Sequence, residues 1–165
     1  MNAKKEQKTL RLLYALIKGS RRSDRELAKV LNVSQPTVTR QRTILEKEKY
    51  INEFTIIPNL TKMGYDFIAV SFMAWTESRP ELMEKAKEWT KARSCVIYAA
   101  NGEGFSMSSI LVSVHKDYAS YSKLITDLRR DWQPNLKSTE TFIISLARPE
   151  LMIKPFSFRY LESCE

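Results

Sequence analysis

The stretch that most constrains the fold is residues 23–49, in which two short helical patterns are separated by a tight turn. Ser23 and Glu26 have the spacing of a capping box, in which a hydroxyl and a carboxylate satisfy the free amide groups at a helix start. Asn32 interrupts the first pattern, and Ser34 can cap the second helix. The spacing therefore predicts a helix-turn-helix.

The second of these helices has two different sides. At about 100° per residue, Val38 and Leu45 lie on nearly the same side, which we expect to face the protein core. The opposite side is small, polar and cationic, and it is narrow enough to enter a groove of DNA. It carries Pro36, Arg40, Thr43 and Lys47, flanked by Thr37 and Thr39.

We expect two kinds of DNA contact from this region. Arg40 has a forked guanidinium that can hold both acceptors of a guanine, and the threonines are candidate groove contacts. Ser34 and Gln35 lie at a helix N-terminus, where phosphate is favoured over a base. The alternative is an ordinary polar helix face with solvated arginines. The expected DNA contacts are Arg22, Arg25, Ser34, Gln35, Pro36, Thr37, Thr39, Arg40, Arg42, Thr43 and Lys47.

Positive charge is concentrated in the same part of the chain. Residues 1–52 hold 13 of the 27 basic residues but only 5 of the 19 acidic ones, so the whole net charge of +8 lies in this segment. Lysine and arginine gain affinity for a polyanion by releasing counterions condensed on its phosphates. Because the charge coincides with the helix-turn-helix, we expect double-stranded DNA as the partner; a solvated basic face is the alternative.

The remaining composition indicates no metal, cofactor or membrane. Cys95 and Cys164 are far apart and have no paired spacing, which indicates neither a disulfide framework nor a zinc cluster. Cys164 could cross-link two copies on oxidation. No apolar run approaches the length of a membrane span or a signal peptide, so we expect a soluble, cytoplasmic protein.

Residues 1–58 are expected to form a winged helix-turn-helix domain. A supporting helix is predicted over residues 8–18 by apolar residues at helical spacing. After the second helix of the motif, two short strands are predicted around residues 52–53, and they would form the wing. Residues 59–65 are expected to be a linker.

From residue 66 the hydrophobic period changes to two, which is typical of strands. Elements are predicted in the order β-α-β-β-α-β, the ferredoxin-like arrangement, so the fold class is α+β. We expect this α/β sandwich over residues 66–148, with a hairpin turn at 101–104. The tail, residues 149–165, alternates aromatic residues and suggests an added strand at a sheet edge. The predicted strands are 66–76, 95–100, 105–115 and 137–146.

Several of these strands are apolar on both sides. In one of them Phe105, Met107 and Leu111 alternate with Ile110, Val112 and Val114. Two helices can cover only one face of a four-stranded sheet, so the other face would be a large exposed apolar patch on a monomer. We therefore expect a second copy of the chain to cover it, which makes a homodimer.

Three segments of the chain resemble the leucine-responsive regulatory protein family, Lrp/AsnC, also called the feast/famine regulators. The family's helix-turn-helix corresponds to DRELAKVLNVSQPTVTRQRTILEKEKYI, its linker and first strand to IIPNLTKMGYDFIAVSFMAW, and a late segment to STETFIISLARPE. The resemblance implies a DNA-binding homodimer built through the sheet domains, which often assembles into octamers. It also implies an amino acid or other small metabolite sensed at an interface between sheet domains.

The chain departs from the family pattern in three places. Lys49 lies where the family usually has glycine before the wing, so we expect the turn to be built differently. Arg42 lies where the recognition helix usually has a buried aliphatic residue. Its stem is expected to run along the core with its guanidinium reaching phosphate, unless the helix is slightly rotated. The hairpin segment 102–106 lacks the family's usual aspartate, which weakens the case for an amino-acid effector.

The hairpin loop is the candidate effector site. Its amide groups could bind a ligand carboxylate; the alternative is a plain turn in which glycines supply positive φ. The candidate effector-binding residues are Asn101, Gly102, Glu103 and Gly104.

Two other functions compete with DNA-binding regulation. Sirohaem decarboxylases have a similar two-part architecture, and His115 could face such a macrocycle. We expect this histidine at the surface, and we expect no enzymatic activity because the chain offers no cluster of catalytic residues. The other alternative is a metabolite-binding module that has lost DNA binding. We expect Trp75, Trp89 and Trp132 to be core or interface anchors.

Overall fold

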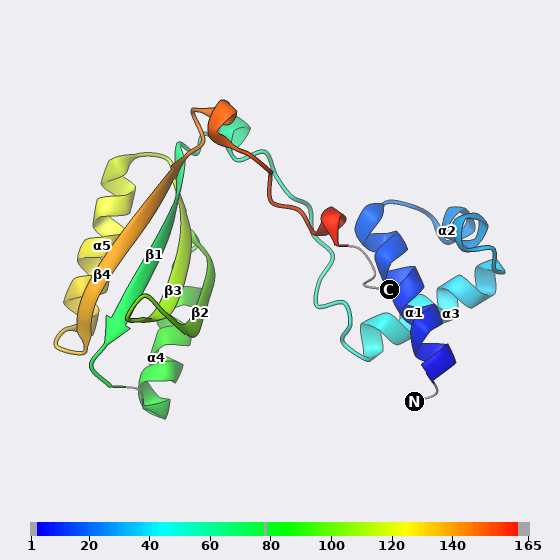
Figure 1. The fold of residues 1–165 in the computed structure, drawn as a ribbon, viewed down its shortest axis with the longest axis horizontal. Helices are drawn as coiled ribbons and strands as arrows, with labels where there is room; N and C mark the ends of the chain where they lie inside the picture. The colour runs from blue at the N-terminus through cyan, green and yellow to red at the C-terminus, as the bar shows by residue number, and fades with distance from the viewer. Residues whose placement is uncertain (1–2, 78, 162–165) are drawn as a thin grey trace. The chain divides into compact units, whose positions relative to one another are not determined.

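The computed structural model describes residues 3–77 and 79–161, and the chain divides into two compact units (Figure 1). The first unit comprises the chain up to Ile57 together with the segment from Lys154 onward, and the second comprises Pro58–Ile153. Cys164 lies outside the described residues. Among those residues no helix is long and apolar enough to cross a membrane. They also contain no group of three or more acidic, histidine or cysteine side chains able to hold a metal ion.

The first unit is built on three helices, α1 (Ala3–Lys18), α2 (Asp24–Leu31) and α3 (Gln35–Lys47). Apolar residues at helical spacing point inward from each helix and form a core in which several side chains are fully buried. The fully buried members are Leu12, Leu27, Val38 and Leu45. The helix-turn-helix and its supporting helix are therefore confirmed.

The expected wing strands do not form, because residues 51–59 have no regular secondary structure. A two-stranded ribbon is marginal in water unless something packs on it, and here Phe54, Ile56 and Ile57 are exposed. The turn before this segment keeps a left-handed geometry without glycine. Lys49 has φ +60°, a conformation that glycine adopts without strain and lysine rarely does.

The second unit has the predicted order of elements. Its strands are β1 (Phe67–Trp75), β2 (Val96–Gly104), β3 (Met107–His115) and β4 (Leu136–Ser145), and its helices are α4 (Pro80–Lys91) and α5 (Tyr118–Trp132). The sheet is antiparallel with the order β2-β3-β1-β4. This is the ferredoxin-like arrangement, and the α+β fold class is confirmed.

Both helices pack on one face of this sheet (Figure 1). The core between them joins Met73 and Leu111 from the strands to Trp89, Leu128 and Trp132 from the helices. The opposite face is apolar, and no helix of the described residues packs on it. In register across it lie Ile68, Val70 and Phe72 of β1, Ile110 and Val112 of β3, and Phe142 and Ile144 of β4. Phe142 is 66% exposed.

The hairpin turn directly follows the four residues of the predicted turn. Residues 101–104 belong to the end of β2, and Gly104 pairs with Met107 across the hairpin. The turn consists of Phe105 and Ser106, with φ values of +52° and +59°, so the expectation that glycines supply the positive φ is wrong. Two central residues with positive φ give the turn whose twist matches paired strands, and this pairing outweighs the preference for glycine.

The histidine expected at the surface is buried. His115 is opposite Phe67 in the sheet, which turns its side chain to the helix-covered face, and it is 1% exposed. Its Nε2 lies 2.8 Å from the Ser113 hydroxyl, and its ring stacks on Phe67 and contacts Tyr121 edge-on. Burial lowers the pKa of His115, opposed by the nearby Asp117 carboxylate. An imidazole enclosed in this way does not face a macrocycle.

The added edge strand expected in the tail does not form in this chain. The described part of the tail contains two 3₁₀ turns instead, Pro149–Leu151 and Phe158–Tyr160. Proline lacks the amide hydrogen that a strand needs, and Pro155 directly precedes the alternating aromatic residues. The turn at Phe158–Tyr160 packs against α1, so this segment belongs to the first unit.

Candidate DNA-binding surface

The start of α2 and the turn that follows it fix the helix-turn-helix. The Ser23 amide and hydroxyl each donate to Glu26 Oε2, at 2.7 and 2.8 Å, and the Glu26 amide donates back to Ser23 Oγ at 3.3 Å. The predicted capping box is therefore confirmed. Asn32 ends α2 with φ +54°, and the amide of Val33 donates to the Ala28 carbonyl at 3.0 Å. This left-handed residue makes the turn tight.

The two sides of α3 are arranged as the helical projection predicts. Val38 and Leu45 are fully buried against α1 and α2, so the helix cannot rotate without opening the core. The opposite side is open to solvent. Its exposed residues are Gln35, Pro36, Thr39, Arg40, Thr43 and Lys47, and Thr37 is half-buried beside them.

Arg40 and Lys47 are the free cations of this exposed side. Among the described residues, no ion pair or hydrogen bond engages either side chain. The Thr43 hydroxyl donates to the Thr39 carbonyl one turn earlier, at 3.1 Å, which leaves its oxygen able to accept. Arg22 and Arg25 are also exposed, in the connection before α2 and in its first turn.

The N-terminus of α3 is not capped by a side chain. Ser34 is the N-cap residue, but its hydroxyl pairs with the Thr37 hydroxyl at 2.7 Å and bonds to no backbone amide. Pro36 lies in the first turn. Pro36 has no amide hydrogen and the Thr37 amide donates to the Ser34 carbonyl at 3.1 Å, so the start of α3 offers a phosphate the Gln35 amide and the positive end of the helix dipole.

Arg42 does not extend towards the exposed side of α3. Its Nε and Nη2 donate to Asp24 Oδ1 at 2.9 and 2.7 Å, while the Thr39 hydroxyl donates to Asp24 Oδ2 at 2.7 Å. Asp24 is the first residue of α2, so these three side chains, which we call the Asp24 clamp, join α2 to α3. The side chains of Arg42 and Asp24 are only 22% and 21% exposed.

The Asp24 clamp also changes the acidity of its carboxylate. The hydrogen bond from Thr39 is the largest influence that lowers the pKa of Asp24, and Arg42 lowers it further, against a partial opposition from burial. The ionised carboxylate is therefore favoured in the folded protein. Of the expected DNA contacts, Thr39 and Arg42 are thus committed to Asp24, and a phosphate contact by Arg42 would require breaking this ion pair.

Asp24 is the residue that the sequence interpretation missed. The sequence did contain a signal, because an arginine at a position that is usually aliphatic needs a counter-charge if its guanidinium is not in solvent. The acidic residue in the first turn of the neighbouring helix is that counter-charge.

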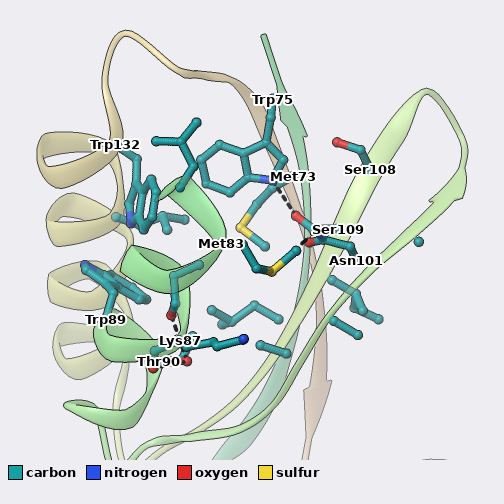
Figure 2. Close-up of a pocket in the computed structure, with 18 of the residues that line it drawn as sticks. Met73, Trp75, Met83, Lys87, Trp89, Thr90, Asn101, Ser108, Ser109 and Trp132 are labelled. Atoms are coloured by element: carbon teal, nitrogen blue, oxygen red, sulfur yellow. Dashed lines mark hydrogen bonds between the residues drawn. The ribbon is translucent and has the colours of Figure 1, made fainter. Parts of the chain in front are cut away.

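The four candidate effector residues lie on two sides of the end of β2. Asn101, Gly102 and Glu103 line a cavity of about 740 Å³ between α4 and the sheet (Figure 2). Gly104 lines a smaller space of about 200 Å³, together with Phe72 and Phe105, and Gly102 and Glu103 border that space too. The structure does not gather their amide groups into one turn, because the turn is at residues 105–106.

A model of winged helix-turn-helix DNA-binding domains matches residues 5–52, which span α1, α2 and α3. A regulator of Pyrococcus abyssi, PYRAB00690, is 39% identical over 61 residues, which are 37% of this chain and 41% of that protein. The regulator LrpA of the same organism is 30% identical over 112 residues, which are 66% of this chain and 76% of LrpA.

Solved structures share the fold of both units. The structure of PH0061, a protein of Pyrococcus horikoshii, matches with a TM-score of 0.73 at 24% identity, over 91% of this chain and 95% of the other. NMB0573 of Neisseria meningitidis, solved as a complex with L-Met, matches with a TM-score of 0.72 at 12% identity. The match covers 83% of this chain and 87% of NMB0573.

An exposed polar and cationic helix on a helix-turn-helix core, joined to an α/β sandwich, defines a DNA-binding transcriptional regulator. Within that class the chain belongs to the Lrp/AsnC family, as its match to LrpA shows and as the resemblance of its sequence predicted.

Proposed function

We propose that the chain regulates transcription as a homodimer that presents two copies of α3 to successive major grooves of double-stranded DNA. The observation that carries this proposal is the exposed side of α3, where Arg40 projects from a helix held rigidly by Val38 and Leu45. A rigid helix with a free forked cation suits the reading of a guanine edge. The two-fold symmetry of such a dimer predicts a pseudo-palindromic site.

The uncovered face of the sheet supports dimerisation. Seven large apolar residues lie in register across β1, β3 and β4 with no helix over them. Soluble monomers rarely expose an apolar patch of this kind, and a second copy offers a self-complementary cover. Assembly of dimers into an octamer is also part of this proposal. Sedimentation analysis measures it directly as the mass of the largest species.

Individual contacts follow from where each side chain lies. We assign base reading to Arg40, with Thr37 and Thr43 beside it. Phosphate binding is assigned to the uncapped start of α3, at Ser34 and Gln35, with Pro36 packed against the backbone of the groove. Lys47, Arg22 and Arg25 add charge at the edges. Thr39 and Arg42 act through Asp24, by holding α3 at its angle to α2.

Regulation by a small metabolite is also part of this proposal. NMB0573, which shares the fold, is described in complex with L-Met. In this chain three of the four residues expected to hold an effector, Asn101, Gly102 and Glu103, line the cavity beside α4. Binding there would affect DNA binding by changing how the sheet domains associate.

The test is DNA binding by the full chain across a range of salt concentrations, on a site selected from random DNA. We expect affinity to fall steeply with salt, because basic residues displace counterions. Arg40→Ala is expected to lose roughly 1 to 3 kcal/mol on the selected site and little on random DNA. Lys91→Ala, a change on an exposed lysine of the second unit, is the control and should alter neither. An equal loss on both DNAs would make Arg40 a phosphate contact, and no loss on either would remove α3 as the reading helix.

A further inference from the structure

We propose that the cavity between α4 and the sheet is a binding site for a neutral aromatic molecule, of bicyclic size or larger, with one hydrogen-bonding group. Its volume of about 740 Å³ falls within the range of roughly 300 to 1,000 Å³ that is typical of small-molecule sites. The lining comes from the second unit alone, from α4, α5 and three strands. The site therefore needs no partner copy to exist.

The walls of this cavity are aromatic and thioether groups. Met73 and Trp75 come from β1, Met83 from α4 and Trp132 from α5, and Figure 2 shows them facing a common space. Trp75 and Trp132 meet edge to face, with ring centroids 5.2 Å apart. Aromatic edges and methionine sulfur both bind aromatic rings favourably. Such a lining favours an occupant that buries apolar surface.

Neutral hydrogen-bonding groups meet at the sheet side of the cavity. The indole Nε1 of Trp75 donates to the hydroxyl of Ser109 at 2.7 Å, and Ser109 is nearly buried. Because that hydroxyl accepts from Trp75, its own proton remains for a ligand; no acceptor for it is found among the described residues. Asn101 of β2 directs Nδ2 at the Met83 sulfur, 3.9 Å away, which is a weak bond that a ligand can replace (Figure 2).

The charges near the opening argue against an ionised ligand. Arg79 is paired with Glu77 at 2.7 Å, and Lys87 is paired with Glu84 at 2.6 Å. Glu103 adds a negative charge at the rim. A carboxylate entering the cavity would lose its hydration without gaining a free cation, which is unfavourable. The chemistry of the lining thus favours a neutral molecule over an amino acid.

The metabolite of the proposed function would then be a neutral aromatic molecule, bound in the cavity beside α4. The proposed site rests on that function only for the effect of the ligand on DNA. Binding itself is measured without DNA, so the two can fail separately.

The experiment uses the full chain and indole as the probe, with calorimetry and methionine-methyl NMR spectra. We expect saturable binding that shifts the methyl signals of Met73 and Met83. The methyl signals of Met63 and Met152, which do not line the cavity, should stay in place. L-Tryptophan, which adds two charges to the same ring, should bind at least about tenfold more weakly.

Two variants locate the site. Ala86→Phe fills the cavity from α4 and should weaken indole binding at least about tenfold, while Lys91→Phe, on the same helix but with its side chain 72% exposed, should leave it unchanged. Ser109→Ala removes the buried hydroxyl and should weaken indole binding about fivefold. If Ala86→Phe is unfolded by circular dichroism, Met83→Trp replaces it, because Met83 is partly exposed and tolerates a larger ring.

Absence of indole binding at millimolar concentration would overturn the proposal. So would equal shifts at all four methionines, tighter binding of L-tryptophan, or unchanged binding in the cavity-filling variant. DNA binding by the Ala86→Phe variant is the control for folding of the first unit. If the variant still binds DNA, its loss of indole binding does not come from an unfolded first unit.

Discussion

The two units of this chain differ in how completely each is packed. The first unit closes a small core around Leu12, Leu27, Val38 and Leu45, all fully buried within one copy of the chain. The second unit is larger, yet one face of its sheet is bare and a cavity of about 740 Å³ lies under α4. The core of the first unit is thus closed within one copy of the chain, while the second unit has an apolar sheet face with no helix on it.

This difference separates two roles. A reading helix has to keep its angle to a groove, so the unit that carries α3 gains from a closed core and from the Asp24 clamp. A unit that associates with a second copy, and that responds to a ligand, has to leave surface and volume free for them. The comparison predicts that substitutions in the two units affect different measurements.

The largest effect is expected from a charge on the bare sheet face. Val112 lies opposite Val70 and Tyr98. Val112→Lys would bury an unpaired cation in each half of the proposed dimer, at roughly 3 to 5 kcal/mol per charge, and should give monomers in sedimentation velocity. Ser122→Lys adds the same charge to the exposed side of α5 and should leave the association unchanged. A dimer that survives Val112→Lys would mean that this face is not the interface.

A smaller effect is expected from a cavity in the first unit. Leu27→Ala removes a fully buried side chain and should lower the free energy of unfolding of that unit by about 3 kcal/mol, with no change in self-association. Val30→Ala, on the same helix but 58% exposed, should be nearly neutral. The measurement is denaturant unfolding followed by hydrogen exchange in each unit. Equal loss of protection in the second unit would refute the independence of the two cores.

The smallest effect is expected from Asp24→Asn, which removes the charge of the Asp24 clamp and should lower the stability of the first unit by about 1 kcal/mol at neutral pH. The folded protein lowers the pKa of Asp24, so its contribution is complete above the unfolded value of about 3.9 and is lost as the pH falls through the lower folded value. The difference in stability between the Asp24→Asn variant and the parent should therefore vanish in acid.

Glu46→Gln, which neutralises an exposed acid on α3, is the control for Asp24→Asn. Its stability at neutral pH should match that of the parent. A difference for Asp24→Asn that persists unchanged below pH 3 would mean that shape, and not charge, holds α2 to α3.

Local patterns in the sequence predicted most of the architecture. The capping box of Ser23 and Glu26, the buried pair Val38 and Leu45, and the order of helices and strands along the chain all depend on short-range spacing, which a single sequence displays directly. The same patterns indicated that one sheet face would be left bare. They also identified the exposed cationic side of α3.

Features that depend on pairing between distant segments were not predicted. The register of β3 against β1 buries His115, and the hairpin pairing puts the positive φ values on Phe105 and Ser106 although glycines are near. The bond between Arg42 and Asp24 joins residues that are 18 positions apart, on two helices whose crossing no local pattern specifies. The cavity beside α4 depends on how far that helix lies from the sheet, which side-chain volumes decide collectively.

The tail that packs on α1 has a consequence for the order in which the protein is made. The second unit, Pro58–Ile153, is inserted within the first, whose last piece begins at Lys154. Because a ribosome releases the chain from its N-terminus, the turn at Phe158–Tyr160 can reach α1 only after the whole sheet has been synthesised. The helical unit is therefore completed only after the sheet has been synthesised.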